Sequence, residues 1–387
     1  MTSRPAPSCD LRQTWAFLRD PAAFTAGPGL SMGDHYRLRI PGHRMHVVSD
    51  PDLVEQILVR RADSFVKGRI YWRELRRTLG DSMGALDGER WAYLHRVQHP
   101  FFTPRAVRGY ARVIEDRVRN HLDGVADGTP VPLLASLSRL KAEIVLAALF
   151  GQTSPSGTHE VVRRMAEGND LAYWMTKFPW RPYLGRINGA HRRAENLLDF
   201  FDALRAQLHG ERPGGPETLL TALEGVATDE SAPAMPADLT RNEIVFHLGA
   251  STETQAAAEG WALYLLWRHP EVRERVRREV DGLGEDAPLG FEDIPKLEQT
   301  RRVLDEALRL FPPVHGIVRE STEDVLVGGR LRARVGDTVL VSVHALHRSP
   351  RWWTSPQAFE PERFLPARRA GYHRFQYVPF GAGRHVC

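Results

Sequence analysis

Cysteine is scarce in this chain: among 387 residues, only Cys9 and Cys387 are present. They could form one disulfide at most, and the simpler interpretation is two free thiols in a reducing compartment. Long apolar runs are lacking too. Neither the first twenty residues nor a stretch such as 144–150 is long enough for a signal peptide or a spanning helix, so we expect a cytoplasmic protein with no membrane span.

An excess of charge of one sign is also missing. The 52 Lys and Arg residues nearly balance the 48 Asp and Glu residues, which leaves a net charge of +4. Without acidic tails or basic blocks, this balance gives no argument for a nucleic-acid partner. The chain contains no P-loop, GxGxxG, GxSxG or HExxH motif, so we expect no flavin or nicotinamide domain of its own.

What the chain does contain is a predominance of helical patterns. A hydrophobic content of 42% suits a soluble globular protein whose core is large enough to enclose a cofactor. Residues 35–40, 44–49 and 325–343 favour short strands near the two ends of the chain. Helices are expected over 51–63, in several pieces over 88–151, as two long helices over 157–210, as one very long helix over 238–269, and after Pro270. The pattern predicts a mainly α protein with a small β region.

The last eight residues, Phe380-Gly-Ala-Gly-Arg-His-Val-Cys387, combine a thiol with a glycine-rich turn. Glycines let a backbone approach a flat cofactor closely, and a thiolate that ligates haem iron favours cleavage of the O–O bond. On this chemistry alone two interpretations remain open, because a cysteine after such a turn is more often an inert surface thiol.

The segment resembles the haem loop of the cytochrome P-450 family, F-x-x-G-x-[HR]-x-C, at Phe380, Gly383, His385 and Cys387. The resemblance covers most of the chain, from about Asp34 onwards, with its motifs in consistent order. It implies haem b ligated through Cys387, with His385 beside a haem propionate and Phe380 in the cofactor loop.

Two charged motifs precede that loop in the family's order. Glu306 and Arg309 stand at i, i+3 in a predicted helix, where side chains can pair. By itself such a pair is usually a solvated surface feature. The segment Pro361-Glu362-Arg363-Phe364 follows, and the resemblance implies a buried ion-pair trio of Glu306, Arg309 and Arg363 behind the haem.

The very long helix carries the run Gly249-Ala-Ser-Thr-Glu253-Thr254-Gln. Small residues in a helix commonly serve helix packing, which is the plainer interpretation. The run also resembles the family's [AG]-G-x-[DE]-T-[ST], matched at Ala250, Glu253 and Thr254, whereas Ser251 and Gln255 depart from it. The resemblance implies that Ala250 borders the haem and that Glu253 and Thr254 deliver protons during dioxygen activation, a general-acid task.

Further residues are assigned to the haem propionates by the same resemblance. The family's W-x-x-x-R begins at Trp91 and has His95 in the arginine position, with Arg96 next to it. Either His95 or Arg96 could serve, and a histidine there would respond to pH near neutrality. Arg319 matches a later arginine that binds the other propionate.

The fold implied is the family's triangular helical prism, treated as one domain over 1–387, with a β-rich lobe from about 34–50 and 314–345. The function implied is a monooxygenase that hydroxylates or epoxidises an apolar small molecule with O2. Electrons would come from a separate ferredoxin or flavoprotein. Substrate contacts are expected from about 66–88, from the helix pair 157–210, and from Phe246, His247, Val314 and Ile317.

Two alternatives remain open. One is a haem-thiolate enzyme that uses peroxide, against which the acid–threonine pair argues. The other is a truncated, haem-poor relative, because the chain stops at Cys387, where the family continues with a glycine and a helix. Without that C-terminal helix we expect the chain as written to bind haem weakly.

Overall fold

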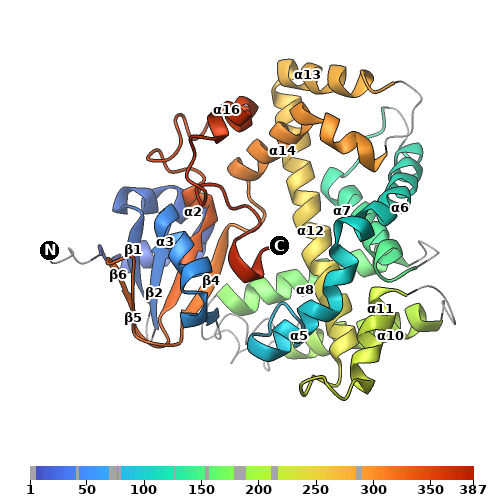
Figure 1. The fold of residues 1–387 in the computed structure, drawn as a ribbon, viewed down its shortest axis with the longest axis horizontal. Helices are drawn as coiled ribbons and strands as arrows, with labels where there is room; N and C mark the ends of the chain where they lie inside the picture. Colours follow the sequence, from blue (N-terminus) through green and yellow to red (C-terminus); the bar gives the residue numbers. More distant parts are fainter. Residues whose placement is uncertain are drawn as a thin grey trace. The chain divides into compact units, whose positions relative to one another are not determined.

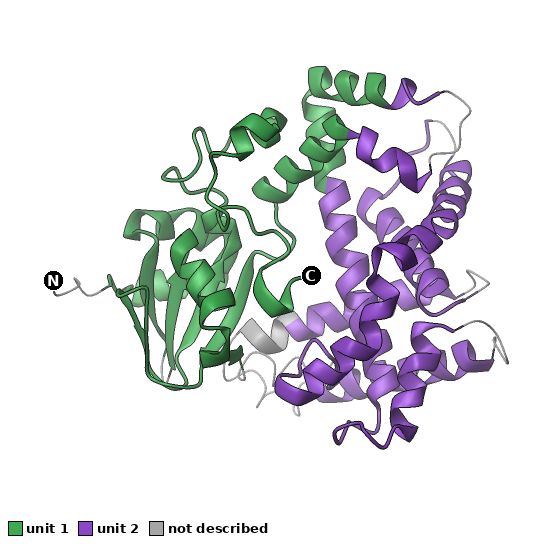
Figure 2. Cartoon of the chain, in the orientation of Figure 1, with its two compact units in different colours: residues 1–71, 261–279, 298–387 green, residues 72–260, 280–297 purple. Residues whose placement is uncertain are grey.

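The computed structural model describes residues 6–40, 43–68, 76, 80–125, 128–152, 157–177, 189–210, 217–284 and 290–387. The chain divides into two compact units (Figure 2). Unit 1 comprises Met1–Tyr71, Trp261–Glu279 and Glu298–Cys387, and unit 2 comprises Trp72–Gly260 and Val280–Leu297. The expected fold class, mainly helical with a small sheet region, is confirmed. That the chain behaves as one domain stays a prediction.

The sheet of unit 1 joins segments from both ends of the chain, as the sequence predicted (Figure 1). Its strand order is β1-β2-β7-β4-β3, with β2 and β7 parallel and the other pairs antiparallel. The strands are β1 (His35–Ile40), β2 (His43–Val48), β7 (Thr338–Ser342), β4 (Gly316–Ser321) and β3 (Phe65–Lys67). A separate hairpin pairs β5 (Val325–Val327) with β6 (Leu331–Ala333). Strand β4 falls within the β-rich stretch expected over about 314–345, whereas β3 was not predicted as a strand.

Short helices of unit 1 start where an aspartate can cap them. Asp10, Asp20 and Asp50 each accept a hydrogen bond from a main-chain N–H in the first turn that follows. These helices are α1 (Leu11–Arg19), α2 (Pro21–Ala26) and α3 (Pro51–Glu55), and α3 continues as a π-helical turn, η2 (Gln56–Arg60). The unit also contains α14 (Glu298–Leu310), α15 (Val343–Leu346), α16 (Pro366–Arg369) and the single turns η1 (Pro28–Met32), η3 (Ala62–Ser64), η7 (Pro361–Phe364) and η8 (Gly383–His385).

Unit 2 is helical in its described residues. Its core gathers buried aliphatic and aromatic side chains such as Leu94, Leu146, Phe150, Phe201 and Ile244. The helices are α5 (Gly88–Gln98), α6 (Pro104–Asp123), α7 (Leu133–Ala148), α8 (Thr158–Lys177), α10 (Ala190–Gly210) and α11 (Leu219–Gly225), with turns η4 (His99–Phe102), η5 (Val226–Thr228) and η6 (Phe291–Lys296).

The longest helix, α12 (Leu239–Arg268), runs from unit 2 into unit 1 (Figure 1, yellow). It matches the predicted helix over 238–269, and α13 (Pro270–Asp281) begins at the predicted proline. Proline disfavours helical backbone in the residue before it, so the two helices separate at His269. No helix in the described ranges is long and apolar enough to cross a membrane.

Candidate functional site

The C-terminal loop of unit 1 is closed by its own main chain. Cys387 donates its N–H to the carbonyl oxygen of Phe380 at 3.0 Å, and Val386 donates to Gly383 at 3.1 Å. Gly381 and Gly383 have φ angles of 74° and 75°, in the left-handed region that glycine adopts without a steric penalty. The loop therefore ends in a defined turn, with the Cys387 thiol exposed.

This loop rests on the segment that follows α3. A Cβ built on Gly383 would lie 2.0 Å from the carbonyl oxygen of Leu58, so only glycine fits at this approach. Arg384 donates to Asp63 at 2.8 Å and to the carbonyl oxygen of Ala62 at 2.9 Å. Leu58 lies in the π-helical turn η2, a type of distortion frequently found at functional sites.

The two cysteines of the chain differ in accessibility. Cys9 is buried, with its Sγ 3.4 Å from the Sδ of Met32. Burial, followed by the charge of Asp10, raises the pKa of the Cys9 thiol to about 11. A thiol binds a metal as the thiolate, so Cys9 is unsuited to ligation at neutral pH. Cys387 is the thiol that a cofactor can reach.

Glu306 and Arg309 form a fully buried, two-bond ion pair on α14. Arg309 donates from Nε and Nη2 to the two carboxylate oxygens at 2.6 and 2.8 Å. Its remaining donors bind the carbonyl oxygens of His347 at 2.9 Å, Pro356 at 2.8 Å and Ala358 at 3.0 Å. The guanidinium is thus satisfied on all sides, as a buried charge requires.

Arg363, in turn η7, is the third member of this buried ion-pair group. Its Nε lies 3.3 Å from Glu306, and its Nη2 donates to the carbonyl oxygen of Ser355 at 2.9 Å. The main-chain N–H of Glu360 also donates to the Glu306 carboxylate, at 2.9 Å. The structure therefore brings the three residues together and ties α14 to the segment 355–363, which leads towards the Cys387 loop.

Helix α5 separates the two candidates for the arginine position of the Trp91 motif. The ring centroids of Trp91 and His95, one turn apart, lie 5.0 Å apart. Arg96 instead covers the ring of Tyr93, at 5.4 Å from its centroid. His95 therefore shares a face with Trp91, whereas Arg96 points along a neighbouring face. Arg319 lies in unit 1 on β4, where its Nη1 donates to the carbonyl oxygen of Val318 at 2.9 Å.

The small-residue run on α12 serves two different purposes. A Cβ on Gly249 would lie 3.0 Å from Met165, so this residue is explained by helix packing. Ala250 is exposed and accepts a hydrogen bond from the Thr254 hydroxyl at 2.6 Å. Thr252 makes the same kind of bond to Leu248 at 2.7 Å, but it is buried. Ala250, Glu253 and Thr254 therefore share the more accessible side of the helix.

The sequence of the chain matches the family described as Cytochrome P450 over residues 30–387. The chain belongs to the cytochrome P450 family. A Streptomyces melanosporofaciens protein named Cyclooctat-9-en-7-ol 5-monooxygenase is 29% identical to it, over 97% of this chain and 82% of that protein. Cyclooctatin synthase from the same organism is 30% identical, over 92% of this chain and 78% of that protein.

Solved P450 structures share the fold. The crystal structure of the cytochrome P450DA heme domain superposes with a TM-score of 0.84 at 23% sequence identity, over 100% of this chain and 88% of that chain. The protein is accordingly a P450 monooxygenase that uses haem b held by a cysteine thiolate. The residues present fit this cofactor, because a glycine-supported loop presents an exposed thiol while the other cysteine is buried.

The candidate substrate residues of this P450 have different surroundings. Val314 is 47% exposed, and Ile317 is partly buried beside Gly381 of the cysteine loop. Phe246 packs against Gly84, but His247 is buried, with its Nε2 2.6 Å from Gln98. Of the expected substrate segments 66–88 and 157–210, residues 69–75, 77–79 and 178–188 lie outside the described residues.

Sequence reasoning missed the partners of His247. Glu243, one turn earlier on α12, is fully buried and accepts a hydrogen bond from Gln98 at 3.0 Å. A signal was present, because Glu243 and His247 stand at i, i+4 among Ile244, Val245 and Leu248, which are apolar. A charged residue amid core positions needs a buried partner.

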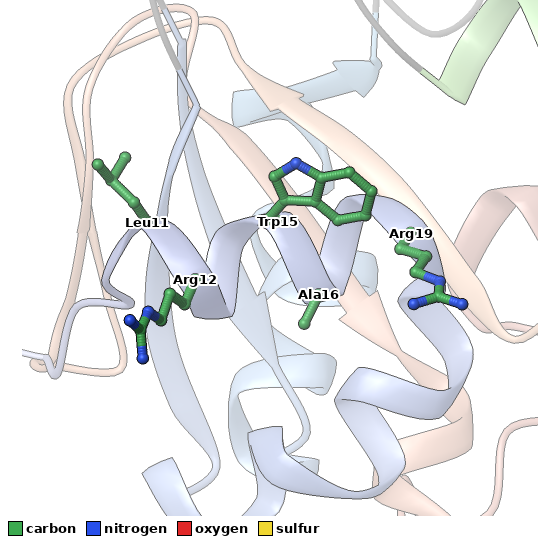
Figure 3. A pocket seen from close by; sticks show the side chains of 5 residues that line it. All are labelled: Leu11, Arg12, Trp15, Ala16 and Arg19. Atoms are coloured by element: carbon green, nitrogen blue, oxygen red, sulfur yellow. The ribbon is translucent and has the colours of Figure 1, made fainter.

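A surface hollow on α1 lacks side chains that suit acid–base or metal chemistry. It is lined by Leu11, Arg12, Trp15, Ala16 and Arg19 (Figure 3), with no acid, cysteine or histidine. Across the described ranges, no group of three His, Cys, Asp or Glu side chains is placed to hold a metal ion. Within the described residues, the hollow on α1 therefore offers no further candidate for acid–base or metal chemistry.

Proposed function

We propose that Cys387 is the haem ligand and that the protein hydroxylates or epoxidises an apolar small molecule with O2. The observation that carries the proposal is the contrast between the two thiols. Cys387 is exposed on a loop with two left-handed glycines, whereas Cys9 is buried and its pKa is raised to about 11. When bound, haem supplies the redox chemistry that activates dioxygen.

Four side chains would hold the haem propionates through their charge or hydrogen-bond donors: Trp91, His95, Arg319 and His385. The shared face of Trp91 and His95 supports His95 over Arg96. Ala250, exposed and small, would leave room for the flat ring beside α12. Glu253 and Thr254 would hold and pass protons to the reacting oxygen, since both lie on that accessible side and a positioned hydroxyl can donate.

The proposed substrate class is supported by apolar side chains near the Cys387 loop and by the name of a similar protein. Ile317 lies against Gly381, and exposed Val314 stands three residues earlier. The name Cyclooctat-9-en-7-ol 5-monooxygenase denotes oxidation of an unsaturated hydrocarbon that bears one hydroxyl. A mid-sized apolar substrate of this chemistry is therefore proposed, with electrons from a separate ferredoxin or flavoprotein, because the chain contains no nucleotide-binding motif.

The test is the absorbance of the reduced protein under carbon monoxide. In a chain continued past Cys387, the protein with both cysteines and its Cys9→Ser variant should both show the red-shifted band of thiolate ligation, and Cys387→Ser should lack it. A full band in Cys387→Ser would overturn the assignment. Product formed with a ferredoxin and its reductase, but not with hydrogen peroxide alone, would distinguish the proposed reaction from a peroxide-using one.

A further inference from the structure

A buried chain of hydrogen bonds in unit 2 links α12 to the segment before α5 and to the C-terminal end of α5. The Glu243 carboxylate accepts hydrogen bonds from the main-chain N–H of Met83 and from Nε2 of Gln98, the latter at 3.0 Å. Oε1 of Gln98 lies 2.6 Å from Nε2 of His247. Met83 stands five residues before the first residue of α5, and Gln98 is its last residue. One carboxylate therefore connects α12 to the segment before α5 and to the last residue of α5.

The direction of each hydrogen bond follows from the Glu243 carboxylate, which can only accept. Its two oxygens accept from the N–H of Met83 and from the amide NH2 group of Gln98. The amide oxygen of Gln98 therefore faces His247, whose Nε2 carries the proton and donates to it. Burial lowers the pKa of His247 to about 4, so the ring is neutral at pH 7 and holds this one proton. A buried donor left without an acceptor destabilises the folded state.

The segment 80–87, which leads into α5, also fits closely onto α12. A Cβ on Gly80 would lie 2.1 Å from the Asn242 side chain, and one on Gly84 would lie 2.4 Å from the ring of Phe246. Asn242, Glu243 and Phe246 lie within about one turn of α12. Three side chains of one helix thus hold the segment, with glycine at the two closest approaches.

We propose that Glu243 is a positioning residue for the cofactor and substrate pocket. Through Met83 and Gln98 it holds α5 and the segment 80–87 on α12. The face of α5 that carries Trp91 and His95 thereby keeps its place relative to Ala250 and Thr254. Glu243 is fully buried, so the role assigned to it is to act through these partners and not on the reacting atoms directly. The inference rests on the proposed haem site.

An exchange of side chains tests this arrangement. Gln98→Glu alone sets two carboxylates face to face and removes the donor to Glu243. The exchanged pair, Gln98→Glu with Glu243→Gln, presents a carboxylate to His247 and an amide oxygen to Met83, so each donor again meets an acceptor. Glu243→Gln alone should be milder, because the Gln98 amide can turn over if His247 moves its proton to Nδ1. Gln207→Glu, on the exposed side of α10, is the matched control.

Two measurements test whether α5 and the segment 80–87 keep their place on α12. Amide hydrogen exchange of peptides covering 80–98 should be at least tenfold faster in Gln98→Glu, intermediate in Glu243→Gln, and as in the wild type in the exchanged pair and the control. In the haem-loaded protein, the dissociation constant of 4-phenylimidazole, read from the absorbance shift, should rise about tenfold in Gln98→Glu. That of the smaller imidazole should change less than twofold, and the exchanged pair should restore both values.

The outcomes separate the two proposals. Equal exchange rates and azole affinities in wild type and Gln98→Glu would overturn the positioning role, and so would an exchanged pair no better than the single variant. If Gln98→Glu fails to fold, recovery of folding in the exchanged pair supports the role, and failure of both contradicts it. Hydrogen exchange needs no haem, so a wild type without the thiolate band would refute the haem site while the exchange rates still decide about Glu243.

Discussion

Gly383 lies directly against the carbonyl oxygen of Leu58, with room for no side-chain atom between them: a Cβ on Gly383 would come within 2.0 Å of that oxygen. This close approach fixes how near the loop that ends at Cys387 lies to the π-helical turn of 56–60. Arg384, the next residue, adds hydrogen bonds to Ala62 and Asp63. The thiol of Cys387 therefore depends for its position on a segment more than 300 residues earlier in the chain.

Gly383→Ala should displace this loop. The new methyl group meets a backbone carbonyl, which cannot move without distorting the turn, and the left-handed backbone adds about 1–2 kcal/mol. We expect a clear loss of haem per protein, measured from the absorbance of purified protein, with the rest of the fold retained. Gly329→Ala is the control, because it has a φ of 69° and nothing within 4 Å of its added Cβ. Equal haem content in the two variants would show that the Leu58 contact does not position the loop.

Glu306→Ala should unfold the region around α14. Removal of the carboxylate leaves the charge of Arg309 buried without compensation, at a cost of about 3–5 kcal/mol. Arg363 keeps its ion pair with Glu360, at 3.0 Å. The expected result is insoluble or haem-free protein. Glu362→Ala, which removes a half-exposed partner of Arg275, should cost about 0–1 kcal/mol in urea unfolding. Soluble, haem-loaded Glu306→Ala would contradict a structural role for the trio.

Thr254→Ala should alter the use of electrons rather than the fold. It removes the hydroxyl that bonds Ala250 on the accessible side of α12. With a surrogate ferredoxin and reductase, we expect severalfold more hydrogen peroxide per electron pair consumed. Thr252→Ala removes an equivalent hydroxyl, bonded to Leu248, from the buried side. It should lower stability and leave the peroxide yield unchanged, whereas equal yields in both variants would exclude a role for Thr254 in proton delivery.

Acid should destabilise the protein through its buried histidines. Burial, followed by the nearby charge of Arg309, lowers the pKa of His347 to about 3. Its Nε2 accepts a hydrogen bond from the N–H of Val378 at 2.9 Å, which a protonated ring could not do. Below about pH 6.5 the unfolded chain gains a proton that the folded protein does not take up, so the free energy of unfolding falls as pH drops towards 3, by about 2 kcal/mol at pH 5.

Urea unfolding at pH 7, 6 and 5 measures this loss, which burial also predicts for His35, His247 and His344, whose pKa values are lowered to about 4. His347→Gln should show a shallower dependence on pH, since an amide oxygen can accept from Val378 and does not titrate. His159→Gln, on an exposed position of α8, is the matched control. An unchanged slope in His347→Gln would mean that His347 contributes nothing to acid sensitivity.

Much of the fold could be predicted because its patterns are local. The helix over 238–269 and the break at Pro270 follow from apolar spacing and from proline, and the structure places them within a residue. The β-rich stretch expected over about 314–345 contains strand β4 but does not specify its bounds, since Gly316–Ser321 does not alternate in burial and is defined by its pairing with β7. Strand β3, three residues long, was not predicted and depends in the same way on β4.

By itself, the sequence determined the family and predicted the loop that ends at Cys387 as the haem-ligand loop, because both rest on residue types at short spacings. Only the tertiary structure supports the proposal of His95 over Arg96, since that choice depends on which face of α5 each side chain occupies. Only the tertiary structure also showed that Glu243 meets Gln98, 145 residues away. A buried polar group needs a hydrogen-bond partner, and tertiary packing determines which residue provides it. A partner so far away in the sequence leaves no pattern among the neighbouring residues.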